Sequence, residues 1–122
     1  MNQSAAQQYQ QNSILTASPG ELTHMLYKGL VKFLRMSLLE LDRKNLEGIH
    51  ANLMKSQSII EELLFTLNMN ISVSENMASM YRYMLERLIE ANLKKDRTVI
   101  EELLGFAEEF RDIWSQAMKV VK

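Results

Sequence analysis

Two Glu-x-x-His motifs, Glu21 with His24 and Glu47 with His50, are the residues of this chain whose spacing could bind metal. Helical bundles build di-iron sites from two such motifs and two further carboxylates. Here, however, each motif falls in the first turn of an expected helix. Two successive antiparallel helices hold those turns roughly 30 Å apart. We therefore expect no metal site, and we expect no cofactor of any kind.

A second chemistry is suggested by His24, Lys28 and Gly29. Histidine phosphotransfer bundles present a His in the middle of a helix, with a Lys that stabilises the phosphate and a Gly that leaves room for the partner. Lys28 stands one position later than in that motif, and His24 lies near a helix end. A phosphotransfer or scaffold bundle in signalling stays open as the alternative function.

Other catalytic patterns are missing from the sequence. No Ser-His-Asp or Lys-based nucleophile arrangement occurs, and no Gly-rich phosphate loop is present. The chain has no cysteine, which excludes thiol nucleophiles, disulfides and thiolate metal sites. We expect no catalytic residues and predict that the protein is not an enzyme.

The composition favours one all-helical domain. The chain has 122 residues, 47% of them apolar, which is enough for a single core. Only four Gly and one Pro accompany nine Met and many Leu, Glu, Lys and Gln. Residues 1–17 are polar and unpatterned, so we expect a flexible N-terminal segment there and a bundle over residues 18–122.

The first helix is expected over residues 19–41. Ser18 can act as N-cap, Pro19 suits the first helical position, and Glu21 completes a capping box. Tyr27 and Val31 fall outside the inner stripe that the three-four spacing predicts. That stripe consists of Leu22, Met25, Leu26, Leu30, Phe33, Leu34, Leu38 and Leu41.

Three further helices are expected, over residues 45–67, 73–94 and 98–120. A stripe begins at Leu46 in the second, a box of Ser72 with Glu75 can cap the third, and Asp96 or Thr98 can cap the fourth. All four helices have about 22 residues, hence a length of roughly 33 Å. Short connectors make neighbours antiparallel, so the sequence predicts an up-down-up-down four-helix bundle.

Charge and hydropathy argue against two classes of partner. The net charge is −1 and charges of both signs are interspersed, so no footprint for nucleic acid is visible. No apolar run approaches the roughly 20 residues of a spanning helix, and the first residues lack the features of a signal peptide. We expect no nucleic-acid binding, no membrane insertion and a cytoplasmic location.

Surplus apolar residues favour recognition of another protein. The nine Met are several times the usual number, and Met side chains suit surfaces that repack around a ligand. Met77, Met80 and Met84 cluster on the third helix. Flanking a core is the simplest role for such residues, but some can line a groove for an amphipathic partner helix.

Motifs typical of one protein family occur in order along nearly the whole chain, on the expected helices, before the first of them and just after the third. They are Tyr9, Thr16-Ala-Ser-Pro19, Glu21-Leu22, Met25-Leu26-Tyr27 and Gly29, then Lys55, Ile59-Ile60 and Leu63, then Tyr81, Tyr83-Met84, Arg87-Leu88, Ala91-Asn92 and Asp96, and finally Trp114. In these motifs the chain resembles the FliS family of flagellar export chaperones.

This resemblance implies a cytoplasmic chaperone that binds the disordered C-terminal segment of flagellin. It would prevent premature polymerisation and help to deliver flagellin to the gate of the flagellar type III export apparatus. A disordered ligand offsets its ordering entropy by covering a large apolar surface, which this chain can offer. Dimerisation of the free protein and binding of other flagellar regulators stay open.

The resemblance also implies a partner-binding surface that the N-terminal segment can cover. Tyr9, Ile14 and Leu15 would form this reversible lid. The helical residues expected beneath or beside it, for which core packing is the competing role, are Leu22, Met25, Leu26, Tyr27, Leu30, Met77, Tyr81 and Met84.

Overall fold

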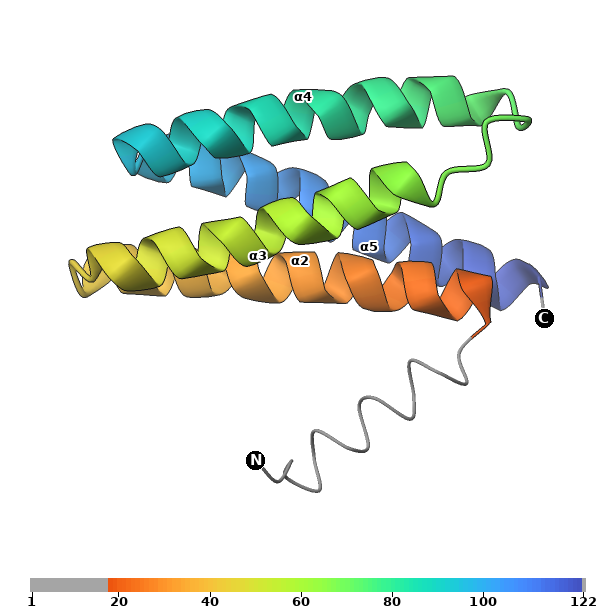
Figure 1. The fold of residues 1–122 in the computed structure, drawn as a ribbon. Helices are drawn as coiled ribbons and strands as arrows, with labels where there is room; N and C mark the ends of the chain where they lie inside the picture. The colour runs from red at the N-terminus through yellow and green to blue at the C-terminus, as the bar shows by residue number, and fades with distance from the viewer. Residues whose placement is uncertain (1–17, 122) are drawn as a thin grey trace, which may run out of the picture.

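The computed structural model describes residues 18–121, which form four helices and no strand (Figure 1). They are α2 (Pro19–Asp42), α3 (Leu46–Phe65), α4 (Val73–Lys94) and α5 (Arg97–Val121). Successive helices run in opposite directions, so the predicted up-down-up-down bundle is confirmed. No helix in this part of the chain is long and apolar enough to cross a membrane.

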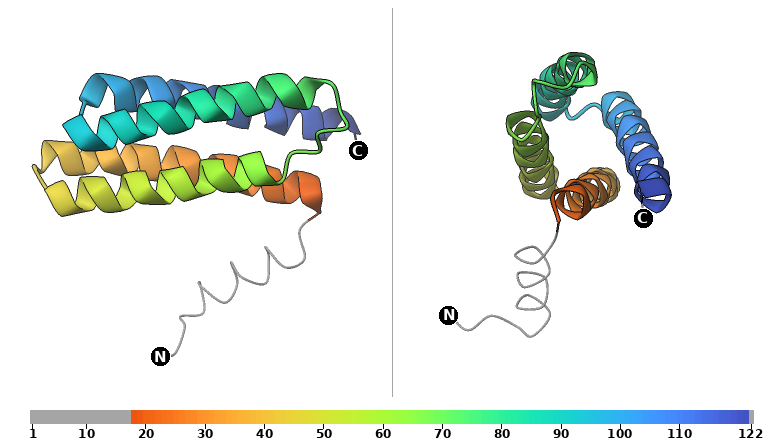
Figure 2. Two further views of the ribbon diagram at one scale, coloured as in Figure 1. Left: turned by 45° about the horizontal axis from the view of Figure 1, so that its top comes forward. Right: turned by 90° about the vertical axis from the view of Figure 1, so that its right-hand side faces the viewer.

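The helices occupy the four corners of the bundle when it is viewed end-on (Figure 2, right). Each helix packs against its neighbours in sequence, and α5 also returns to pack against α2. The connectors are residues 43–45, 66–72 and 95–96. The longest of them, between α3 and α4, lies at the end of the bundle where α2 begins and α5 ends (Figure 1).

Side-chain caps fix the starts of the first and last helices. The Ser18 hydroxyl accepts a hydrogen bond from the Glu21 amide at 3.2 Å, and Pro19 is the first helical residue, as predicted. At the fourth helix the Asp96 carboxylate accepts from the Thr98 amide at 3.0 Å. Of the two candidate caps at that position, the structure therefore uses Asp96.

The predicted capping box at Ser72 and Glu75 is wrong. Ser72 has helical backbone angles and its side chain makes no cap hydrogen bond. Instead, the buried Ser74 donates its hydroxyl to the Asn68 carbonyl at 2.7 Å. The connector folds over the start of α4. The hydroxyl that bonds to the connector therefore comes from Ser74, which is buried, and not from Ser72.

The core face of α2 is turned relative to the predicted stripe. Tyr27 and Val31, expected outside it, are only 1% and 2% exposed. Because α2 packs against α5 as well as α3, it buries a second flank, and the Tyr27 ring stacks on Phe110 of α5 with centroids 5.8 Å apart. On α3 the stripe begins one turn late, since Leu46 is 65% exposed and Ile49 is buried.

Candidate partner-binding site

A largely apolar pocket of about 210 Å³, here called the end pocket, opens where α2 begins and α5 ends. The connector between α3 and α4 forms its rim. Its lining side chains include no ionisable group except two phenols. The lining consists of Thr23, Tyr27, Leu63, Thr66, Leu67, Asn68, Ile71, Val73, Ser74, Met77, Tyr81 and Trp114.

Two tyrosines meet on the inner side of this pocket. The hydroxyls of Tyr27 on α2 and Tyr81 on α4 lie 2.5 Å apart, which joins diagonally opposite helices by a hydrogen bond. Phe110 stands against both rings, with centroids 5.8 and 6.1 Å away. Burial raises the pKa of both phenols, so both hydroxyls stay protonated near neutral pH.

Trp114 ties the end of the bundle together. Its indole Nε1 donates to the Gly20 carbonyl of α2 at 2.8 Å, and its ring meets Tyr27 edge-on at 6.2 Å. The hydrogen bond holds the first turn of α2 against the last part of α5. Ser18, where the described part of the chain begins, therefore lies close to the end pocket.

Exposed apolar side chains gather at the connector that forms the pocket rim. Phe65, Met69, Ile71 and Val73 are 85%, 58%, 52% and 53% exposed. All four lie at or next to the connector between α3 and α4. Clustered apolar groups of this kind mark interaction surfaces more often than scattered ones do. The arrangement can bind apolar side chains of a polypeptide.

The structure brings three of the predicted site residues together. Tyr27, Met77 and Tyr81 all line the end pocket. The others lie elsewhere: Leu22, Met25 and Leu26 are half-buried on α2 outside the pocket. Leu30 and Met84, at 1% and 0% exposure, belong to the core and offer no surface to a partner in this conformation. The proposed lid residues Tyr9, Ile14 and Leu15 lie outside the described residues.

Several pocket residues were not predicted as site residues. The sequence places Trp114 only among the family motifs and Leu67 only at the end of the second expected helix, and it gives Ile71 and Val73 no site role. A usable signal existed at Ile71, an apolar residue in an expected connector, where solvent exposure is the rule. Its apolar character is explained by its position on the pocket rim.

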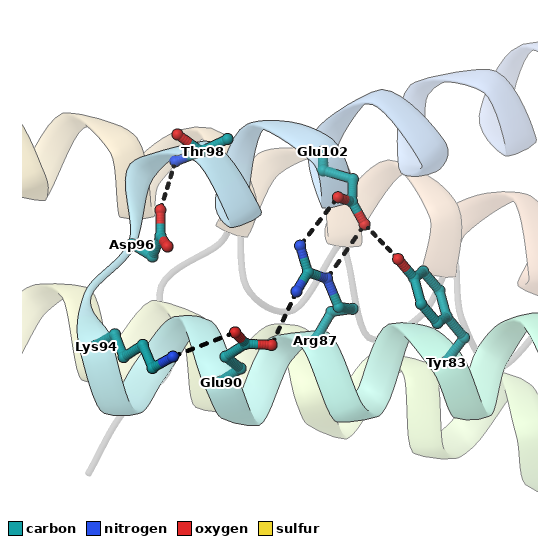
Figure 3. Close-up of polar contacts among 7 residues, drawn as sticks. All are labelled: Tyr83, Arg87, Glu90, Lys94, Asp96, Thr98 and Glu102. Atoms are coloured by element: carbon teal, nitrogen blue, oxygen red, sulfur yellow. Dashed lines mark hydrogen bonds and ion pairs between the residues drawn. The ribbon is translucent and has the colours of Figure 1, made fainter.

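A polar network fastens α4 to α5 away from the end pocket (Figure 3). The Glu102 carboxylate accepts hydrogen bonds from the Arg87 guanidinium at 3.1 Å and the Tyr83 hydroxyl at 2.9 Å. Arg87 also pairs with Glu90 at 2.8 Å. The bonds from Arg87 and Tyr83 lower the pKa of Glu102. The C-terminal half of α4 is thus held to α5 by charges, and its N-terminal half borders the pocket.

The histidine motifs do not converge. His24 lies at the start of α2 and His50 at the start of α3, which are opposite ends of the bundle (Figure 1). His50 instead shares a hydrogen bond of 2.9 Å with Asn92. Within residues 18–121, no group of three or more His, Cys, Asp or Glu side chains could hold a metal ion.

Comparison with known proteins agrees with the geometry. The sequence model of a family described as "Flagellar protein FliS" matches residues 1–121. The chain is 49% identical to the flagellar secretion chaperone FliS of Bacillus subtilis (strain 168), over 91% of this chain and 84% of that protein. It is 29% identical to the Escherichia coli (strain K12) protein of the same name, over 88% of this chain and 82% of the other.

The match covers nearly the whole chain, and the identity to one relative is high. The similarity is therefore not limited to isolated motifs. The helical bundle, the Trp114 contact and the aromatic cluster of Tyr27 and Tyr81 all lie within the matched residues. The chain therefore belongs to the FliS family of flagellar proteins, whose curated relatives are secretion chaperones.

Proposed function

We propose that this protein is a cytoplasmic chaperone that binds the disordered C-terminal segment of flagellin. Binding would prevent premature polymerisation and present flagellin to the gate of the flagellar type III export apparatus. The observation that carries the proposal is the end pocket with its exposed apolar rim. Family membership supplies the identity of the cargo.

The pocket suits an unfolded ligand on physical grounds. A disordered segment that orders on binding must offset its lost entropy with buried apolar surface. The rim residues already expose such surface, while the Tyr27 and Tyr81 hydroxyls share a hydrogen bond with each other. Apolar cargo side chains can therefore enter while that hydrogen bond stays intact.

The N-terminal segment is proposed to cover this surface when cargo is absent. Residues 1–17 carry no charged side chain, and the helix that follows them begins beside the pocket. Tyr9, Ile14 and Leu15 are the side chains in it that gain most from apolar contact. Replacing Tyr9 by Ala should alter affinity for flagellin and leave thermal stability nearly unchanged, whereas Gln11→Ala should alter neither.

Two isoleucines of equal exposure provide a matched test of the pocket. Ile71 on the rim is 52% exposed, and Ile89 on α4, outside the pocket lining, is 50% exposed. Ile71→Ser should weaken binding of a fluorescently labelled C-terminal flagellin segment several-fold. The substitution removes apolar contact that contributes about 1 kcal/mol to the binding free energy. Ile89→Ser should bind like the unmodified protein.

The result separates two claims. Equal binding by both variants would show that the end pocket is not the flagellin site, even if the protein binds flagellin elsewhere. No binding by the unmodified protein would contradict the proposed function itself. Circular dichroism melting of both variants checks that the fold is retained.

A further inference from the structure

A second surface, here called the basic groove, runs between α2 and α5. It encloses about 360 Å³, and five basic side chains line it. They are His24, Lys28, Lys32 and Arg35 of α2 and Arg111 of α5. The α2 residues are spaced four, four and three apart, so they form one row over three turns, roughly 16 Å long.

The charge in this groove is only partly compensated. Arg35 pairs with Glu108 at 3.0 Å and Arg111 pairs with Asp112 at 2.9 Å. Lys28 and Lys32, by contrast, have no carboxylate within salt-bridge distance in the part of the chain that the structure describes. Like charges one helical turn apart disfavour the helix, so fold stability does not account for this pair.

Neighbouring groups respond to the positive potential or add to it. Burial, followed by the charges of Lys28 and Arg111, lowers the pKa of His24. Beside the groove, the Lys32 and Lys55 ammonium groups both lie over the ring of Phe33, 5.4 and 5.3 Å from its centroid. The basic surface thus continues from α5 across α2 to α3, in a protein whose net charge is −1.

We propose that the basic groove docks an acidic, helical segment of a partner protein. Lys28 and Lys32 stand about 6 Å apart along the axis of α2. Carboxylates one turn apart on a partner helix have the same spacing, so each can pair with one lysine. This surface is distinct from the end pocket, and the proposal does not depend on flagellin as the cargo.

The surrounding charges favour a peptide over nucleic acid or an anionic membrane. Glu108 and Asp112 stand within or beside the basic row and would face a continuous phosphate surface. A double-stranded nucleic acid presents a charge about every 1.7 Å and would place phosphates against both carboxylates. A peptide helix can instead set its carboxylates opposite the lysines alone.

The probe for this proposal is a fluorescein-labelled amphipathic model peptide with Glu at successive i, i+4 positions. Its analogue with every Glu replaced by Gln serves as the ligand control. Anisotropy titration of the full chain should show binding of the Glu peptide that weakens with added salt, and much weaker binding of the Gln analogue. The double variant Lys28→Glu/Lys32→Glu should bind the Glu peptide about tenfold or more weakly.

The matched protein control is Arg82→Glu/Lys119→Glu, which makes the same change in net charge at two exposed positions outside the groove. This variant should retain most of the affinity. Equal losses in both variants, or no binding of the Glu peptide at all, would overturn the proposal. Tighter binding of single-stranded DNA or of phosphatidylglycerol vesicles than of the peptide would also overturn it, because the ligand class would then be wrong.

Discussion

At the scale of residues, the Tyr27 and Tyr81 hydroxyl pair determines how the end pocket is built. The two groups are buried, 2.5 Å apart, and contributed by helices that are not neighbours in sequence. Each hydroxyl is the other's hydrogen-bonding partner, so a substitution of either tyrosine also affects the tyrosine on the other helix. The pair keeps a polar contact inside a pocket that is otherwise suited to apolar side chains.

Removing one of the two hydroxyls should destabilise the bundle, although only one oxygen atom is lost. Tyr81→Phe leaves the buried Tyr27 hydroxyl unpaired and should lower the free energy of unfolding by about 1–2 kcal/mol. Tyr27→Phe should act similarly. The double variant should be no worse than either single variant, because no orphan group remains. Urea unfolding of all four proteins measures the coupling, and strictly additive losses would contradict it.

The same pair predicts a loss of stability at alkaline pH. Burial raises the pKa of both phenols above their unfolded value of about 10. Below about pH 10 both states are protonated and the contribution is complete. Above it the unfolded chain loses phenolic protons that the folded chain keeps, so stability falls as pH rises. The Tyr27→Phe/Tyr81→Phe variant should show a smaller fall in Tm between pH 9 and pH 11.

The burial of Tyr27 could not be predicted from the spacing of apolar residues along α2. Its position lies off the stripe that helical spacing predicts, yet it is 1% exposed because α5 covers it. Spacing within one helix reports a single apolar face. Which second helix packs against its flank is a tertiary property, and no local pattern encodes it.

At the scale of elements, α4 is held differently at its two ends. Near its start, Tyr81 and the buried Ser74 anchor it beside the end pocket. Towards its end, the network of Tyr83, Arg87 and Glu102 joins it to α5 (Figure 3). Charges therefore fix one half of α4, while the other half borders the surface proposed for cargo.

Replacing Glu102 by Gln should weaken the attachment of α4 to α5. The loss should be smaller than that of Tyr81→Phe and should shrink at high salt, because the network is partly exposed. The lowered pKa of Glu102 means that its contribution is present above its unfolded pKa and lost as pH falls. Thermal melts at low and high salt test this, and a loss independent of salt would contradict it.

Gly105 offers a stabilising change within α5. Nothing lies within 4 Å of a Cβ added there, and the residue is exposed inside a helix. Gly105→Ala should raise the free energy of unfolding by about 0.5–1 kcal/mol, since Ala loses less backbone entropy. Gly29→Ala is the contrasting variant, because its Cβ would lie 3.1 Å from the Ile59 side chain. A larger gain at Gly29 than at Gly105 would contradict this account.

The helices themselves were largely predictable, and one of their caps was not. Apolar spacing located all four, and Ser18 starts α2 as its local sequence predicts. Ser72 fails as a cap because the connector before α4 folds back and uses Ser74 instead. A capping box is a local motif. It does not form here, because packing sets the path of the connector.

At the scale of the whole molecule, the protein presents two surfaces of different character. The end pocket is apolar, and the basic groove is charged. The all-helical fold followed from composition and spacing, and three of the predicted site residues share the pocket. Apolar Ile71 in the connector was a usable signal, but the position of Trp114 in the pocket could not be predicted, because the pocket forms only where distant parts of the chain meet.

Under the proposed function, this protein binds the C-terminal segment of flagellin through apolar surface. Isothermal titration calorimetry of the full chain with that segment, at several temperatures, measures this binding. We expect saturable binding with a negative heat-capacity change, because apolar surface is buried as the ligand orders. Absence of binding to the segment and to full-length flagellin, or binding with no change in heat capacity, would contradict it.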